Sequence, residues 1–143
     1  MITERLRDIR EDSNLKQSDM AQILKTTQSN YSRWENGTEF IPLKKLTILC
    51  NYFNVSMDYI VGITRDETGN GKHHLDNKIM GKNLKKIRTD NNISQTDLAN
   101  FLKTSQSTIS AYESGKTTIL TAFAFQIVNK YKVSLDWLPG RIK

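Results

Sequence analysis

The sequence contains the same segment twice, and this repeat constrains the fold more than any other feature. Residues 6–62 overlay residues 84–140 without a gap, and roughly 22 of the 57 aligned positions are identical. A repeat of this length is too long to be one unit of a solenoid. It therefore predicts two copies of one small domain, although a length of 143 residues alone would suggest a single domain.

The segment between the copies has the composition of a linker. Residues 63–77 are mostly polar, include two glycines and contain few apolar side chains. We therefore expect a first domain at residues 1–62, a linker at 63–77 and a second domain at 78–143. Fully extended, a linker of about 15 residues spans at most roughly 50 Å.

Each copy predicts a string of five short helices, so the expected fold class is all-α. Apolar residues recur at helical spacing at Ile2, Leu6 and Ile9, and the second copy repeats this pattern. The next three helices are expected at residues 17–24, 28–36 and 43–53, and in the second copy at residues 95–102, 106–114 and 121–131. Ser56 and Ser134 are expected to cap a short fifth helix that ends near residues 62 and 140.

The helix ends carry local signals as well. Thr27 and Ser105 are suited to cap the start of the third helices, and the glycines at 37 and 115 suit the left-handed residue that closes them. Ser94 with Asp97 predicts a capping box in the second copy. The first copy has Lys16 at the matching position, so the start of that helix is less well defined.

The chain is basic, and its charge is divided unevenly. The formal net charge is +6 and the isoelectric point is about 9.5, which favours an acidic partner, above all nucleic acid. Residues 1–62 hold 8 basic and 8 acidic side chains, whereas residues 78–143 hold 11 basic and 4 acidic ones. Because phosphate neutralisation supplies non-specific affinity, we expect the second copy to contribute most of it.

Catalytic chemistry is not expected from this sequence. The only histidines, His73 and His74, lie in the linker, and the only cysteine, Cys50, matches a core valine of the second copy. This leaves no nucleophile–base arrangement and no zinc-ligand set. No apolar run approaches the ~18 residues of a membrane span, and the N-terminus lacks a signal-peptide core. We expect a cytoplasmic protein with no cofactor, metal, membrane partner or evident small-molecule ligand.

Three motifs in each copy resemble one family. In the first copy they are QSDMA at 17–21, TQSNYSRWENG at 27–37 and VSMDYIVG at 55–62. In the second copy they are QTDLA at 95–99, SAYESG at 110–115 and VSLDWL at 133–138. These segments resemble the helix-turn-helix signature of the Cro-type phage repressors, which belong to the XRE family.

The resemblance implies two five-helix, lambda-repressor-like domains and a bacterial or phage regulator that binds double-stranded DNA. In such proteins the third helix enters the major groove and the second crosses the backbone. Family members usually act as homodimers of single domains. Because this chain carries two domains, it would act either as a homodimer or as an intrachain pseudo-dimer.

The third helix separates into an inner and an outer side. Tyr31, Trp34 and Glu35 share one side, which should face the core. The outer side should contact bases through Gln28, Ser29, Asn30, Ser32 and Arg33, and in the second copy through Gln106, Ser107, Thr108, Ser110 and Ala111. Arginine can pair bidentately with guanine, and glutamine or asparagine with adenine. The alternative interpretation is an ordinary polar surface stripe.

The resemblance also implies phosphate contacts and two structural ion pairs. The expected phosphate-contacting residues are Gln17, Asn36, Lys44, Lys45, Gln95, Ser114 and Lys116, although the two adjacent lysines would equally suit a solvated surface. A helix N-terminus itself favours an anion. The expected ion pairs join Arg10 to Glu35 and Arg88 to Glu113.

The leading hypothesis is a sequence-specific DNA-binding regulator that represses transcription by occupying an operator. The alternative is a protein-interaction module, antitoxin-like or antirepressor-like, in which one helix-turn-helix serves as a docking or dimerisation surface. The small, uncharged outer side of the second copy favours this alternative, whereas the charge of that copy opposes it.

Overall fold

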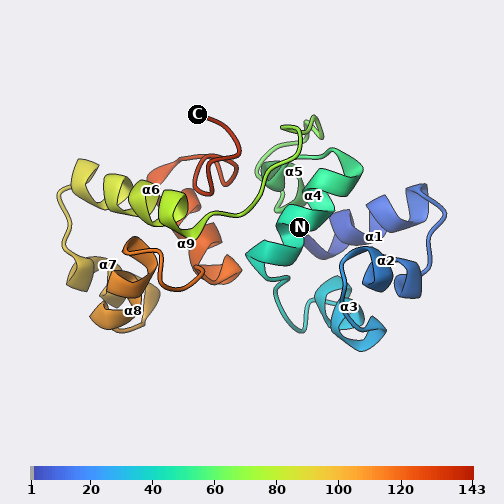
Figure 1. The fold of residues 1–143 in the computed structure, drawn as a ribbon, viewed down its shortest axis with the longest axis horizontal. Helices are drawn as coiled ribbons and strands as arrows, with labels where there is room; N and C mark the ends of the chain where they lie inside the picture. The colour runs from blue at the N-terminus through green and yellow to red at the C-terminus, as the bar shows by residue number, and fades with distance from the viewer. Residues whose placement is uncertain (1) are drawn as a thin grey trace. The chain divides into compact units, whose positions relative to one another are not determined.

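The computed structural model describes residues 2–143, with side chains from residue 4 onward, so the side chain of Ile2 lies outside the described part. The helices, drawn in Figure 1, are α1 (Ile2–Asp12), α2 (Gln17–Ile23), α3 (Gln28–Glu35), α4 (Leu43–Phe53), α5 (Met57–Ile60), α6 (Asn77–Asp90), α7 (Gln95–Leu102), α8 (Gln106–Glu113) and α9 (Thr121–Tyr131). Within this range the only strand-like feature is an isolated bridge between Val55 and Thr68. The all-α expectation is confirmed. None of the described helices is both long and apolar enough to cross a membrane.

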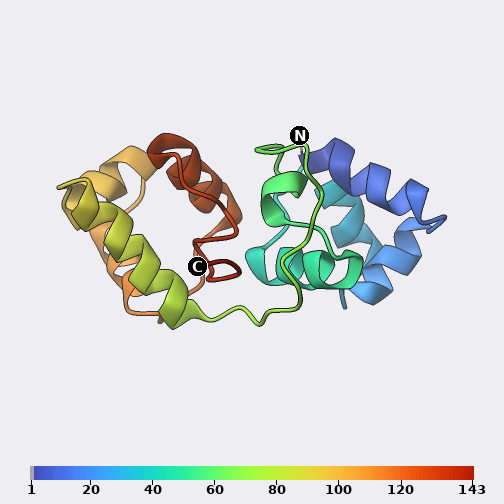
Figure 2. The ribbon, with the colours of Figure 1, turned by 90° about the horizontal axis from the view of Figure 1, so that it is seen from above.

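The chain forms two compact units that divide between His73 and His74. The first unit therefore extends beyond residue 62, because part of the segment expected as a linker packs against it. Asn51 of α4 donates to the His73 carbonyl at 2.7 Å and accepts from the His73 amide at 3.1 Å. A Cβ on Gly69 would lie 2.5 Å from the Asn54 carbonyl carbon. In Figure 2 this segment is the green chain that passes α4, and only residues 74–76 connect it to α6.

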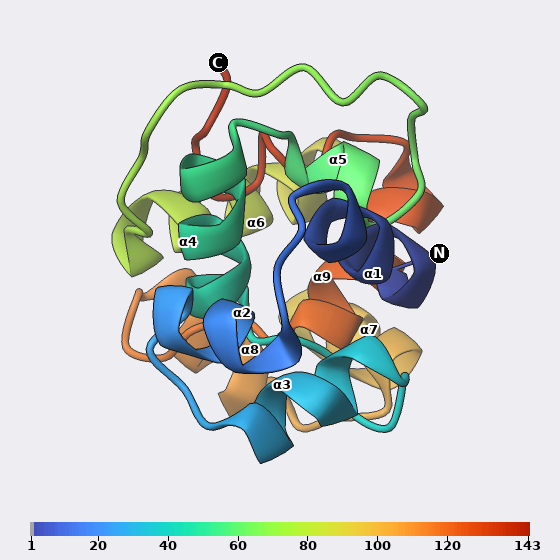
Figure 3. The same ribbon diagram turned by 90° about the vertical axis from the view of Figure 1, so that its right-hand side faces the viewer.

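Each unit buries an apolar core between its helices. In the first unit α3 packs against α1 and α2, and in the second α8 packs against α6 and α7. Figure 3, which looks onto the first unit, shows α2 and α3 together at the side away from α5. The fully buried large side chains of the two cores include Leu6, Met20, Leu24, Tyr31, Leu46, Leu49, Met57, Ile60, Met80 and Leu84. Burial of this kind is the main stabilising contribution in domains of this size.

The expected helix caps are present. Thr27 accepts a hydrogen bond from the Asn30 amide at 3.1 Å, and Ser105 accepts one from the Thr108 amide at 3.2 Å. Ser94 and Asp97 form the reciprocal capping box at 3.0 and 2.9 Å, and the bond from the Ser94 amide lowers the pKa of Asp97. The glycines after both third helices adopt left-handed backbone angles, with φ of 83° and 79°. Each third helix therefore begins at the predicted residue and ends one residue earlier than predicted, at Glu35 and at Glu113.

The fifth helix forms in the first unit only. There, Ser56 caps α5, and the Val61 amide donates to the Met57 carbonyl at 3.0 Å. Pro139 replaces Val61 in the second unit and has no N–H to make this bond. Residues 135–140 consequently form turns, so the expectation of a second fifth helix was wrong. A buried ion pair at 3.5 Å between Arg141 and Asp136 lies at this end of the second unit.

The crossing of α6 and α8 depends on a residue without a side chain. A Cβ on Gly81 would lie 2.4 Å from the Tyr112 carbonyl oxygen and 2.5 Å from that of Glu113. We expect Gly81→Leu to force the helices apart and to destabilise the second unit by about 1–3 kcal/mol or more. Urea unfolding followed by Trp137 fluorescence, with Trp34 replaced by Phe, measures this.

The matched control for Gly81→Leu is Lys82→Ala on the exposed side of the same helix. This change should alter the free energy of unfolding by no more than about 0.5 kcal/mol. If Gly81→Leu had as small an effect as the control, the close helix crossing would not be important for stability.

Candidate nucleic-acid interface

Both units contain two helices joined by a short turn, with the second helix exposed along one side. In the first unit α2 packs on α3, and Lys25 takes a left-handed φ of 55° in the turn between them. Lys103 does the same between α7 and α8, with φ of 57°. Tyr31, Trp34 and Glu35 of α3 are buried. The residues on the opposite side of α3 are exposed or half-buried, so the helix can present polar groups to a large ligand.

A partly buried ion pair joins the first and third helices of each unit. In the first, Arg10 donates to Glu35 through Nε at 2.9 Å and through Nη2 at 2.8 Å. In the second, Arg88 donates to Glu113 through Nε at 2.8 Å and through Nη2 at 3.0 Å. Burial alone would raise the pKa of Glu35, but the hydrogen bonds and the charge of Arg10 outweigh it and lower that pKa. Each pair therefore fixes the orientation of a third helix relative to its unit.

The start of α3 and the start of α2 together line a shallow hollow. Its volume is about 400 Å³, and its walls are formed by Gln17, Gln28, Ser29 and Ser32. Gln28 and Ser29 are exposed, and Ser32 is half-buried. Four side chains expected to contact DNA from two different helices thus lie around one hollow. They carry amide and hydroxyl groups, which can both donate and accept hydrogen bonds.

Asn30 and Arg33 are held to one another and to their surroundings. Arg33 donates through Nη2 to Oδ1 of Asn30, while Asn30 donates through Nδ2 to Oγ1 of Thr26 at 3.0 Å. Glu39, in the loop after α3, places its Oε1 3.2 Å from Nε of Arg33. Neither Thr26 nor Glu39 was expected at this site from the sequence motifs. Glu39 lies beyond the end of the helix, so helical spacing could not have placed it beside Arg33.

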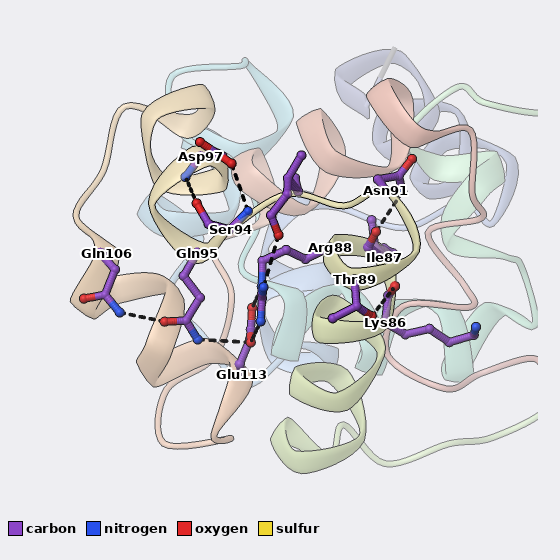
Figure 4. A network of polar contacts seen from close by, with 11 residues as sticks. Lys86, Ile87, Arg88, Thr89, Asn91, Ser94, Gln95, Asp97, Gln106 and Glu113 are labelled. Carbon is purple, nitrogen blue, oxygen red and sulfur yellow. Dashed lines mark hydrogen bonds and ion pairs between the residues drawn. The ribbon is translucent and has the colours of Figure 1, made fainter.

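In the second unit, Gln106 on the outer side of α8 belongs to a chain of side-chain hydrogen bonds, shown in Figure 4. Gln106, the first residue of α8, donates to Oε1 of Gln95 at 2.6 Å, and Gln95 donates to Oε1 of Glu113 at 3.1 Å. The chain continues into the ion pair with Arg88. Gln95 and Gln106 are thus oriented by the buried network below them. Ser107 and Thr108 share contacts with the Ser105 hydroxyl at 3.0 and 2.8 Å, and Ser110 and Ala111 are half-buried.

The other residues that were expected to contact phosphates differ in their exposure and in their hydrogen bonds. Asn36 accepts from the Thr38 amide at 2.9 Å, and Ser114 donates to the Ala111 carbonyl at 3.1 Å, so both follow the ends of their helices. Lys44 and Lys116 are exposed. Lys45 instead donates to the Lys25 carbonyl at 3.0 Å, which ties α4 to the turn after α2. In the described part of the chain, no group of three metal-ligating side chains comes together.

Comparison with known proteins agrees with this geometry. A family model described as "Helix-turn-helix domain" matches residues 3–61, and one described as "Helix-turn-helix" matches residues 84–138. The uncharacterized HTH-type transcriptional regulator YobD of Bacillus subtilis is 35% identical over 87 residues, which cover 61% of this chain and 70% of YobD. Antitoxin PezA of Streptococcus pneumoniae is 36% identical over 62 residues, 43% of this chain and 39% of PezA. No solved structure matches.

The chain belongs to the XRE family of helix-turn-helix proteins, a class of DNA-binding transcription regulators. The resemblance drawn from the sequence motifs is thereby confirmed. Families of this type are typically regulators rather than enzymes.

Proposed function

We propose that this protein represses transcription by binding an operator in duplex DNA through the outer side of α3, with α8 as a second contact. The observation that carries the proposal is the polar hollow of Gln17, Gln28, Ser29 and Ser32, with Arg33 on the same helix. Amide and guanidinium groups can pair bidentately with base edges. The YobD relative, a transcriptional regulator by name, supports this assignment.

We further propose that one chain covers two unlike half-sites as an intrachain pseudo-dimer. Third helices on the same face of a duplex lie about 34 Å apart, or 10–10.5 base pairs. The three residues between His73 and Asn77 span at most roughly 14 Å, far less than the whole segment from 63 to 77. If both units bind one duplex while residues 63–73 stay packed on the first, His73 and Asn77 must lie within this distance.

A protein-interaction function remains the second candidate, mainly for the second unit. The hydroxyl and amide groups at the start of α8 bond to one another and to α7, which leaves fewer of them for bases. The similarity to an antitoxin also favours it, although the match covers only 39% of that relative. In this version the first unit binds DNA and the second docks on a protein.

Selection of duplexes from a random pool, followed by footprinting, tests these proposals. We expect the full chain to enrich two unlike half-sites about one helical turn apart and to protect both as a monomer. Ser110→Glu with Ala111→Glu should remove one half-site, and the matched Ser32→Glu with Arg33→Glu should remove the other, because acids on these faces repel phosphates.

The possible outcomes separate the alternatives. Loss of one half-site with each variant supports two DNA-binding units. A single half-site that is insensitive to the α8 changes favours a docking role for the second unit. If no sequence were enriched, the proposed operator binding would be wrong. If the protein had the solution mass of a dimer and protected four half-sites, it would act as a homodimer and not as an intrachain pseudo-dimer.

A further inference from the structure

The loop after α3 returns an acidic residue to the outer side of that helix. Gly37 turns the chain with φ of 83°, and Asn36 accepts bonds from the amide and hydroxyl of Thr38 at 2.9 and 2.5 Å. The Glu39 amide then donates to the Arg33 carbonyl at 3.2 Å. This main-chain bond holds the loop at the level of Arg33, which brings the Glu39 carboxylate within reach of the guanidinium.

The two partners of Arg33 contact two of the three nitrogens of its guanidinium group. Glu39 lies against Nε, and Asn30 accepts from Nη2, and these two nitrogens form the side edge of the planar group. Neither contact involves Nη1, the third nitrogen of the group. Asn30 cannot easily turn away, because its own Nδ2 is bonded to Thr26 at 3.0 Å.

We propose that Glu39 is a positioning residue that, together with Asn30, presents Arg33 end-on to a guanine in the half-site of the first unit. This inference rests on the proposed DNA-binding function. The end of a guanidinium group, formed by Nη1 and Nη2, carries two parallel N–H groups, which match the O6 and N7 acceptors of guanine in the major groove. Because Glu39 and Asn30 already restrict the Arg33 side chain, fewer of its conformations are lost when it binds a base, and the entropic cost of binding is lower.

The second unit lacks all three parts of this arrangement. Thr108, Ala111 and Thr117 stand at the positions of Asn30, Arg33 and Glu39. The repeat therefore supplies an internal control: a guanine preference of this kind should belong to one half-site and be absent from the other.

The experiment measures affinities of full-length variants for the selected duplex and for versions with each guanine of the first half-site replaced. Arg33→Ala should reduce discrimination at one base pair by about 5- to 150-fold. Glu39→Gln keeps the shape and removes the charge, and it should reduce discrimination at that same base pair by about 2- to 5-fold, the range of an exposed ion pair. In the Arg33→Ala background, Glu39→Gln should have no further effect on discrimination.

Two controls distinguish positioning from charge or stability. Glu4→Gln removes the same charge from an exposed position on α1 and should leave discrimination unchanged, as should Thr117→Ala in the second unit. Thermal unfolding should be unaltered, because Glu39 is 53% exposed. If Glu39→Gln instead tightened binding to all duplexes equally, or left every base preference unchanged, the positioning role would be wrong. Failure to select any duplex would refute the proposed function itself.

Discussion

Replacing Arg10 by methionine is expected to destabilise the first unit by about 3–5 kcal/mol, because it removes the closest partner of the buried Glu35 carboxylate and leaves the more distant Arg7, at 3.6 Å, as its nearest cation. The Glu35 side chain is 2% exposed and receives three hydrogen bonds from Arg10, two from Nε and one from Nη2. A loss of this size is a large part of the total stability of a small domain. Denaturant unfolding followed by the fluorescence of Trp34, in a Trp137→Phe background, reports on this unit alone.

The control for this prediction replaces both partners. Arg10→Met together with Glu35→Leu should recover much of the lost stability, since a buried ion pair can be exchanged for apolar side chains of similar volume. If the single replacement cost less than about 1 kcal/mol, or if the double replacement were no better, the ion pair would not hold α1 and α3 together as argued.

The same pair predicts the pH dependence of the first unit. Since the pKa of Glu35 is lowered in the folded state, its ionised form contributes stability at pH values above the pKa of the unfolded chain. This contribution is lost as the pH falls through the folded-state pKa. The free energy of unfolding of the first unit should therefore fall in acid, and less steeply in the doubly replaced variant.

The DNA affinity of the second unit is expected to depend more steeply on salt than that of the first. We expect the second unit to supply most of the non-specific DNA affinity, because its basic surplus is concentrated on α6. Four exposed lysines lie along one side of this helix, at positions 78, 82, 85 and 86. The backbone of Lys78 approaches Gly115, just beyond the end of α8, so this basic surface begins beside the expected phosphate contacts. The first unit has Glu4, Arg7 and Asp8 at the positions of the last three lysines.

Exchanging charges between the two helices tests this expectation. Lys82→Glu with Lys86→Asp should lower the affinity for mixed-sequence DNA and reduce the log–log salt slope by about 0.9 for each phosphate that is no longer neutralised. Glu4→Lys with Asp8→Lys should raise that affinity. Titrations at two salt concentrations measure both effects. An unchanged slope in the first variant would place the non-specific binding surface elsewhere, and equal slopes for residues 1–73 and 74–143 would contradict the division between the units.

The sequence alone determined the features that depend on neighbours within about one helical turn. Thr27 and Ser105 cap their helices with bonds to residues three positions later, and the buried side of α3 follows directly from helical spacing. The repeat itself identified the two-domain organisation and, through its motifs, the family. Even the missing fifth helix had a local cause, the proline at 139, whose lack of an N–H could have been recognised in the sequence.

Only the tertiary structure decided how distant segments meet. The packing of residues 63–73 on α4 depends on Asn51 reaching the backbone of His73, 22 residues away, and polar composition alone predicted a linker there. The contact between Glu39 and Arg33 depends on the path of the loop after α3. The side-chain hydrogen bonds that link Gln106 to Glu113 through Gln95 depend on the placement of α7. Such contacts are set by how the helices pack around the core, because a long-range hydrogen bond leaves no periodic pattern in the sequence.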